Sequence, residues 1–199
     1  MNLYILALYT IGREAVDTTR FTIENIVVTT KIADAFDLDH VSRTFPDSHR
    51  NPAETSLVVI HKTTPVQAAV MIFPNGTLMC TGTKTIHDTE TIIHTTIKLL
   101  HAAGFPVKEN PEILVQSIVA SQELQKKIDL SALAKSLGVM KASYNPSEFP
   151  GLIYKKNDNH NISVLLFDTG KIVCTGTNVD DVTRAFEHIT NDLLSYGIK

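Results

Sequence analysis

Hydrophobic and polar positions alternate along much of this chain, in short runs that are rich in β-branched residues. This pattern is typical of strands that have one covered and one uncovered face. The predicted strands are residues 23–30, 56–61, 68–73, 77–81, 113–120, 152–155, 163–167 and 171–175. Asn75-Gly76 predicts a hairpin turn between two of them, because both residue types tolerate positive φ. Asp168-Thr169-Gly170 predicts the matching turn in the second half.

Two longer segments follow the helical period of about 3.6 residues. In residues 88–103, apolar side chains recur on one face, and Gly104 predicts the end of the helix. Residues 181–195 repeat that pattern ahead of Gly197. Shorter helices are predicted at residues 37–45 and 130–137. Helices that collect on one side of an antiparallel sheet define an α+β fold.

The second half of the chain repeats the first. Residues 71–83 read MIFPNGTLMCTGT and residues 165–177 read LLFDTGKIVCTGT, an offset of 94 positions. Residues 51–54 (NPAE) and 145–148 (NPSE) match at the same offset. An internal duplication decides the architecture before other features do.

Each half contains the same succession of a strand, a short helix, further strands and a long helix. We divide the chain into an N-terminal extension (residues 1–20), repeat 1 (residues 21–110) and repeat 2 (residues 111–199). Two copies are too few for a solenoid. The predicted architecture is one pseudo-twofold duplicated unit.

One face of the predicted sheet must be covered by the two long helices, which leaves the other uncovered. Cys80 and Cys174 occupy equivalent strand positions, and their neighbours point to the other side of the sheet. Alternation places these side chains on the uncovered face: Asn25, Val27, Thr29, Met79, Thr81, Ser117, Val119, Val173 and Thr175. A face with many apolar side chains and few charges is unusual on a monomer. We expect it to be a docking surface.

Composition and charge narrow the classes of function. The chain has 43% hydrophobic and 20% charged residues, as an ordinary globular protein does. Its net charge of −3 argues against nucleic-acid binding by bulk electrostatics alone. Two cysteines are too few for a disulfide framework, so we expect buried thiols in a reducing, intracellular compartment. The apolar residues 1–9 lack a basic flank and are too short to span a membrane, so no membrane association is expected.

No arrangement of residues indicates an enzyme, a cofactor or a metal site. No GK[ST] sequence follows the Thr-Gly-Thr segments, which excludes a phosphate-binding loop. His87, His94 and His101 are spaced by seven and lie two helical turns apart, which favours a solvated surface over metal ligands. Asp180 and Asp181 are typical of the first turn of a helix.

Several short motifs, taken together and in order, resemble the TATA-box-binding protein family, the general transcription factors of archaea and eukaryotes. The motifs are NIV at 25–27, CTG at 80–82 and 174–176, GFP at 104–106, YNP at 144–146 and FPGLIY at 149–154. The resemblance runs from residue 23 to the end. It implies a pseudo-twofold α+β saddle, with two long helices on the convex face of a curved antiparallel sheet. It also implies that the uncovered face binds and bends A·T-rich promoter DNA through the minor groove.

The resemblance implies roles for individual side chains. Phe73, Phe149 and Phe167 are the rings expected to wedge between base steps, and Asn25 is expected at the pseudodyad. The side chains expected to line the groove are Val27, Met71, Met79, Thr81, Val119, Leu165, Val173 and Thr175. The cations expected at phosphates are Lys84, Lys155 and Lys171.

The sequence departs from the family pattern at functional positions. The first wedge position of repeat 1 is Thr55, and the second central asparagine is replaced by Ser117. Basic residues of the family are replaced by His61, Thr77 and Asn178. We therefore expect weaker DNA binding and bending, with a salt slope lowered by about one for each lost phosphate contact.

The family resemblance also implies a protein partner. Family members are expected to recruit a transcription factor B-like protein through the loop before Phe149. Here the loop contains Asn145, Ser147 and Glu148, of which only Glu148 is acidic. We expect these three residues to contact that partner.

The sequence favours a non-enzymatic transcription initiation factor, monomeric or weakly dimeric, that binds TATA-like promoter DNA. The expected location is an archaeal cytoplasm or nucleoid, with the nucleus as the alternative. A second hypothesis is a divergent protein-interaction module or regulator with weak or no DNA binding. A third is an appendage of a nucleic-acid enzyme, although this chain has no room for a catalytic domain.

Overall fold

The computed structural model describes residues 21–45, 48–50, 58–60, 66–155 and 162–197. Their strands form one antiparallel sheet in the order β2-β3-β4-β5-β1-β6-β10-β9-β8-β7. The strands of repeat 1 are β1 (Thr22–Lys31), β2 (His49–Arg50), β3 (Val58–Ile60), β4 (Ala69–Ile72) and β5 (Thr77–Thr83). Those of repeat 2 are β6 (Ile113–Glu123), β7 (Ala142–Ser143), β8 (Leu152–Tyr154), β9 (Ser163–Leu166) and β10 (Lys171–Gly176). The halves meet where β1 pairs with β6, and the strand order mirrors itself about this pair.

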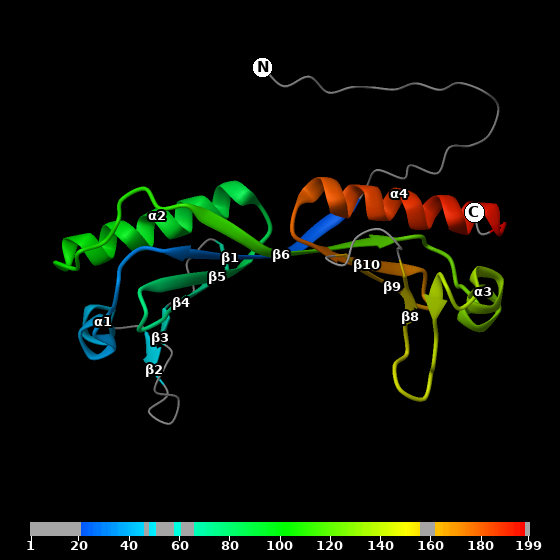
Figure 1. Cartoon of the computed structure of the whole chain (residues 1–199), viewed down its shortest axis with the longest axis horizontal. Coiled ribbons are helices and arrows are strands. Elements are labelled where there is room, and N and C mark those ends of the chain that lie inside the picture. The colour runs from blue at the N-terminus through cyan, green and yellow to red at the C-terminus, as the bar shows by residue number, and fades with distance from the viewer. Residues whose placement is uncertain (1–20, 46–47, 51–57, 61–65, 156–161, 198–199) are drawn as a thin grey trace, which may run out of the picture.

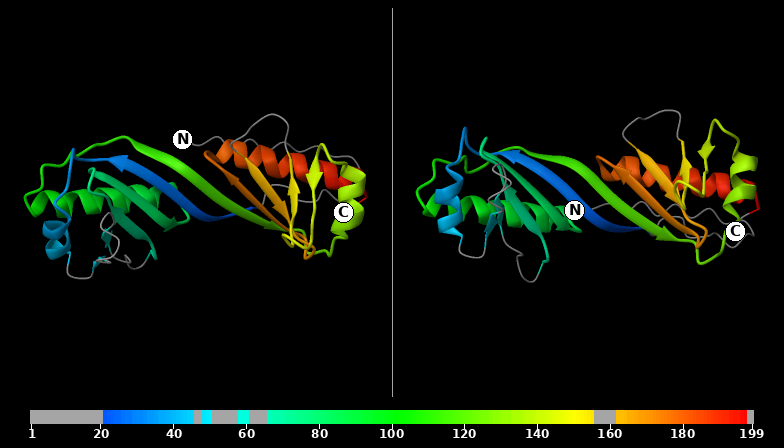
Figure 2. Two further views of the ribbon diagram at one scale, coloured as in Figure 1. Left: turned by 60° about the horizontal axis from the view of Figure 1, so that its bottom comes forward. Right: turned by 90° about the horizontal axis from the view of Figure 1, so that it is seen from below.

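Two long helices cover one side of the sheet. They are α2 (Ile86–Ala102) and α4 (Val179–Ser195), and Figure 1 shows them one after the other along the convex side. The short helices α1 (Leu38–Thr44) and α3 (Leu130–Leu137) lie at the two ends of the molecule. Figure 2 shows the concave side from below, where no described helix covers the sheet. The α+β saddle expected from the sequence is confirmed.

Each half has its own hydrophobic core between its long helix and its strands. In repeat 1, Ile93 of α2 is buried with Cys80 of β5. In repeat 2, Ile189 of α4 is buried with Cys174 of β10. Ile23, on the central strand β1, packs against both cores. The long helices therefore pack on one side of the sheet, and the short helices α1 and α3 add to the two cores.

Both cysteines are buried thiols, as predicted. Burial raises the pKa of the Cys80 thiol to about 11. The thiol therefore stays protonated at neutral pH and behaves as an apolar core group.

Gly76 and Gly170 hold the two equivalent hairpin turns against neighbouring loops. Their φ angles are 81° and 88°. A β-carbon would lie 1.9 Å from the carbonyl oxygen of Ala33 at Gly76, and 2.2 Å from that of Lys126 at Gly170. Only glycine fits this approach of two backbones. The turn predicted at Asn75-Gly76 is present, and its positive φ is at Gly76.

The observed elements differ from the predicted ones at their ends. β2 and β7 have no predicted counterpart, because a two-residue strand shows no alternation. α2 and α4 begin two residues earlier than predicted because polar side chains cap them. Thr85 Oγ1 accepts from Asp88 N at 3.0 Å, and Asn178 Oδ1 accepts from Asp181 N at 2.8 Å. Asn178 thus caps a helix where the family pattern has a basic residue.

Candidate nucleic-acid interface

The concave side of the sheet, here called the open face, consists of side chains that alternate with the core residues. On β1, Ile26 and Val28 are buried, whereas Asn25, Val27 and Thr29 are partly exposed. Strand pairing extends this alternation across the sheet, since directly paired residues share a side. The predicted DNA-binding residues on the open face are Asn25, Val27, Thr29, Met71, Met79, Thr81, Ser117, Val119, Leu165, Val173 and Thr175.

Two irregularities in the pairing of β1 with β6 add polar groups at the centre of the open face. The register skips Glu24 in β1 and Gln116 in β6. Such bulges re-aim side chains. Gln116 Nε2 donates to Thr29 Oγ1 at 2.8 Å, and Ser121 Oγ donates to Glu24 Oε1 at 2.6 Å. The two hydrogen bonds occupy pseudo-twofold equivalent positions, and each links β1 of repeat 1 to β6 of repeat 2 at the centre of the open face.

Asn25 is oriented by the backbone of β5. Its Oδ1 accepts from Gly82 N at 2.7 Å, and the Thr81 hydroxyl oxygen lies 3.2 Å from both Oδ1 and Nδ2. A backbone N–H can only donate, so this bond assigns the amide oxygen to the strand and leaves the NH₂ group as a donor. Gly82 has a φ of 98°, which turns its N–H toward Asn25. The face therefore presents an oriented hydrogen-bond donor near its centre.

Phe149 and Phe167 form an aromatic pair at one end of the open face. Their ring centroids are 6.0 Å apart with an interplanar angle of 63°, an edge-to-face arrangement. Phe149 is 36% exposed, and neither ring belongs to a hydrophobic core. A β-carbon on Gly151 would lie 2.7 Å from Phe149 Cε1 and 3.2 Å from Phe167 Cε1. The absence of a side chain at Gly151 therefore makes room for the pair.

Phe73 occupies the position in repeat 1 that Phe167 occupies in repeat 2. The N–H of Phe73 donates to Thr77 O at 2.9 Å, and that of Phe167 donates to Lys171 O at 2.9 Å. Phe73 is half-buried and belongs to neither core. Thr55, the departure at the other wedge position of repeat 1, lies outside the described residues.

Two of the three predicted phosphate-binding lysines have acidic neighbours. Lys84 Nζ lies 3.1 Å from Glu24 Oε2, and Lys171 Nζ lies 3.7 Å from Glu123 Oε1. Lys155 is exposed and forms no salt bridge with a described residue. Positive charge around the open face is thus partly compensated within the protein.

The sequence of both repeats matches one known family. The family profile described as "Transcription factor TFIID (or TATA-binding protein, TBP)" matches residues 20–103 and 112–196. This chain belongs to the TATA-binding protein family. It is 36% identical to the TATA-box-binding protein of Archaeoglobus fulgidus over 180 residues, which are 90% of this chain and 97% of that protein.

Two further relatives of the TATA-binding protein family agree. The chain is 37% identical to TATA-box-binding protein 1 of Methanosarcina acetivorans, over 88% of this chain and 96% of that protein. Among solved structures, the Methanococcus jannaschii TBP matches with a TM-score of 0.77 at 35% identity, covering 88% of this chain and 98% of that one. The fold and the sequence therefore identify the same family.

In this TATA-binding protein fold the open face includes two exposed apolar side chains that the sequence analysis does not predict. Leu114 is 49% exposed and pairs with Thr29, and Ile153 is 41% exposed and pairs with Leu165. The irregularity at Gln116 breaks the alternation that would have assigned Leu114 to this face. The strand of Ile153 is too short to show a period, and only its pairing with a lining residue gives the signal.

The predicted partner residues lie between β7 and β8. Asn145, Ser147 and Glu148 are all exposed. Ser147 Oγ donates to Asn145 Oδ1 at 2.7 Å, so these two side chains hold the turn. Glu148 is the acidic residue of the loop and directly precedes Phe149.

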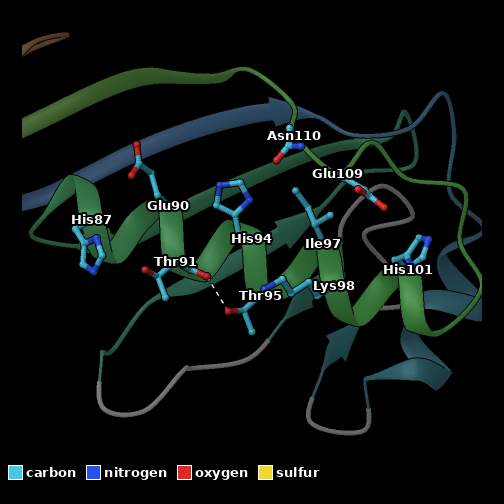
Figure 3. A pocket seen from close by; sticks show the side chains of 10 residues that line it. All are labelled: His87, Glu90, Thr91, His94, Thr95, Ile97, Lys98, His101, Glu109 and Asn110. Carbon is cyan, nitrogen blue, oxygen red and sulfur yellow. Dashed lines mark hydrogen bonds between the residues drawn. The ribbon is translucent and has the colours of Figure 1, made fainter.

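The convex side has a different character. An open groove of about 730 Å³ runs along α2, lined by His87, His94 and His101 together with Glu90 and Glu109. Figure 3 shows the three imidazoles spread along the helix. Among the residues that the structure describes, no group of three or more His, Cys, Asp or Glu could hold a metal ion. No helix in the described ranges is long and apolar enough to cross a bilayer.

Proposed function

We propose that this protein is a transcription initiation factor that binds and bends A·T-rich promoter DNA through the minor groove. The observation that carries the proposal is the open face, which is uncovered, mainly apolar and duplicated about a pseudo-twofold axis. The printed names of its relatives, TATA-box-binding proteins, support the same function. The action is non-enzymatic, and repeats 1 and 2, at residues 21–110 and 111–199, each contact one half of the site.

The chemistry of the open face favours A·T pairs. Their minor-groove edges present only hydrogen-bond acceptors, whereas a G·C pair adds the guanine amino donor. The amide NH₂ of Asn25 can donate to those acceptors, because its oxygen is occupied by Gly82 N. Apolar side chains such as Val119 and Val173 offer no acceptor to a guanine amino group. An A·T-rich site therefore loses less hydrogen bonding on binding than a G·C-rich one.

Bending is proposed from the exposed rings. An apolar ring inserted between base pairs partly unstacks a step, at a cost of a few kcal/mol in minor-groove binders generally, this family included. That cost is offset by the larger surface that a bent duplex wraps. Phe73, Phe149 and Phe167 lie outside both cores at the ends of the open face, where they can insert without disturbing the fold.

The proposed partner is a transcription factor B-like protein, held by the loop that contains Asn145, Ser147 and Glu148. Glu148 supplies the acidic contact, and Lys84, Lys155 and Lys171 meet DNA phosphates. The protein acts as a monomer, because its two repeats already provide the twofold surface that a duplex needs. It acts where promoter DNA is found, inside an archaeal cell.

The experiment compares two apolar-to-acidic variants in a fluorescence bending assay on a TATA-containing duplex. Val119→Glu places a carboxylate on the open face, whereas Leu99→Glu changes an exposed apolar residue of α2 on the convex side. Binding and bending are expected for the wild type and Leu99→Glu, and loss of both for Val119→Glu. If the wild type does not bend the duplex at low salt, even with a B-type factor, or if Val119→Glu bends it normally, the proposal is wrong.

A second candidate function is a protein-interaction module without DNA binding. The pairing of Lys84 with Glu24 and of Lys171 with Glu123 favours it, since both cations already have acidic neighbours. The salt dependence of duplex binding separates the two functions. Binding through phosphates weakens steeply as the salt concentration rises. A module that binds only protein shows no salt-dependent binding of the duplex.

A further inference from the structure

The two ends of the open face carry different numbers of aromatic rings. At the end formed by repeat 2, Phe149 and Phe167 pack edge to face. At the end formed by repeat 1, Phe73 makes no ring contact with a described residue. At the offset of 94, the residue of repeat 1 that corresponds to Phe149 is Thr55.

The residue at the position of Gly151 also differs between the repeats. Gly151 leaves room for Phe149 and Phe167, with its missing β-carbon 2.7 Å and 3.2 Å from their Cε1 atoms. The corresponding residue of repeat 1 is Leu57, which has a branched side chain. Repeat 1 therefore lacks both the second ring and the glycine that would make room for it.

Two of the three predicted phosphate contacts, Lys84 of repeat 1 and Lys171 of repeat 2, have an acidic neighbour. Lys84, the predicted phosphate contact of repeat 1, is held by Glu24 at 3.1 Å. Lys155, in repeat 2, is exposed and has no salt-bridge partner among the described residues. Among the described residues, no carboxylate has to be displaced for a phosphate to bind Lys155.

We propose that this protein kinks its DNA at one end only, at the base step held by the Phe149–Phe167 pair of repeat 2. The inference rests on the proposed function and adds a direction to it. The two rings for which Gly151 leaves room present a wide apolar wedge that is already assembled, whereas Phe73 has no ring contact with a described residue. The duplex under repeat 1 stays stacked, and the chain itself decides which end of a symmetric A·T-rich site is bent.

The test locates the unstacked step relative to the protein. Ser147→Cys, in the exposed loop before Phe149, carries an iron chelate that cleaves nearby DNA. Labelling is selective because Cys80 and Cys174 are fully buried. Permanganate oxidises thymines that have lost stacking, so it marks the kink. We expect iron cleavage and permanganate reactivity at the same end of a TATA-containing duplex, with the other end as unreactive as free DNA.

Variants of both repeats sharpen the test. Phe149→Ala should return the reactive thymines to the level of free duplex, and Phe73→Ala should leave them reactive. The double variant Thr55→Phe with Leu57→Gly should make the second end reactive as well. If Phe149→Ala does not bind, the double variant alone decides. Circular dichroism confirms that each variant is folded, as expected because Phe73 and Phe149 belong to neither core.

The outcomes separate the inference from the function on which it rests. Equal reactivity at both ends of the wild-type complex overturns the one-ended kink and leaves DNA binding intact. The one-ended kink is also wrong if the thymines stay reactive when Phe149→Ala is bound. It is likewise wrong if the double variant makes no second end reactive. Absence of iron cleavage at low salt overturns the proposed function itself.

Discussion

Small and polar residues decide how the apolar open face is presented. Gly151 leaves the space in which two rings meet, and Gly82 turns its N–H toward Asn25. Glu24 lies on the same face in spite of its charge, tied to Ser121 and to a lysine. The apolar residues thus form the surface of the open face, while the two glycines set the positions of neighbouring side chains and Glu24 sets the local charge.

Gly151→Ala should separate bending from folding. The added β-carbon lies 2.7 Å from Phe149 Cε1, and this ring, 36% exposed, can move aside. We therefore expect the free energy of unfolding to change by less than about 1 kcal/mol, while DNA bending falls toward that of Phe149→Ala. Urea denaturation and the fluorescence bending assay measure the two effects. Unchanged bending would mean that the edge-to-face pair is not needed for the kink.

Glu24→Gln should strengthen the salt dependence of DNA binding. The substitution removes a carboxylate from the open face and releases Lys84 to a phosphate, which raises the salt slope by about one. Fluorescence anisotropy across a salt series measures it. Glu90→Gln, on the convex side, is the matched control and should leave the slope as in the wild type. An unaltered slope in Glu24→Gln would show that Lys84 does not meet a phosphate.

The same carboxylate gives stability a dependence on pH. Hydrogen bonds from Ser121 and then from Lys84 lower the pKa of Glu24 below its ordinary value of 4.5. A lowered pKa stabilises the folded protein above the ordinary value, and this contribution is lost as the pH falls through the folded-state pKa. The stability difference between wild type and Glu24→Gln should therefore shrink on acidification. Because the pair is largely exposed, the difference at neutral pH is small.

At the scale of elements, hairpin turns and helix caps define where strands and helices end. The turns at Gly76 and Gly170 each press against a loop that leaves a central strand, and Ile32 N and Leu124 N donate to the two glycine carbonyls at 3.0 and 3.1 Å. These contacts connect the hairpins β4–β5 and β9–β10 to β1 and β6.

Gly76→Ala should destabilise the protein far more than Gly138→Ala. Both glycines have a positive φ, and the ψ of 164° at Gly138 lies in a region essentially confined to glycine, where an alanine costs about 1–3 kcal/mol. At Gly76 the added β-carbon also meets the Ala33 carbonyl at 1.9 Å, whereas at Gly138 nothing lies within 4 Å. We expect a loss of about 1–3 kcal/mol for Gly138→Ala and a larger loss for Gly76→Ala, measured by urea denaturation. Equal losses would show that the turn can move away from its loop.

At the scale of the whole molecule, two separate cores share one continuous sheet. The β1–β6 pair joins the halves, and Ile23 and Val115 pack against both cores. Neither half can lose its central strand without exposing the other. The repeats should therefore unfold together.

Leu100→Ala in repeat 1 and Ile189→Ala in repeat 2 test this coupling. Both residues are buried, and each truncation should lower the free energy of unfolding by about 2–5 kcal/mol. We expect one cooperative unfolding transition in each variant, shifted to a lower denaturant concentration. Far-UV circular dichroism and the reactivity of the buried thiols with a labelling reagent should report the same transition. Two transitions, of which only one is shifted, would show that the halves unfold independently.

Much of this architecture follows from the sequence, because the informative patterns are local. Alternation around Cys80 and Cys174 assigns the side chains of the open face, and the repeat at an offset of 94 predicts the pseudo-twofold order of elements. The positions of both hairpin turns are also predicted. Each of these patterns depends on residues within a few positions of one another.

Only the tertiary structure decides how distant segments are matched. The skipped residues Glu24 and Gln116 interrupt the strand period, so neither their direction nor the exposure of Leu114 follows from alternation. The Glu24–Lys84 and Glu24–Ser121 contacts join residues 60 and 97 positions apart. Such contacts depend on the register between strands, and this register is set by packing of the entire sheet. The duplicated apolar face and the missing ring of repeat 1 are thus inherent in the sequence, whereas the polar centre of the face and the edge-to-face packing of Phe149 with Phe167 are consequences of folding.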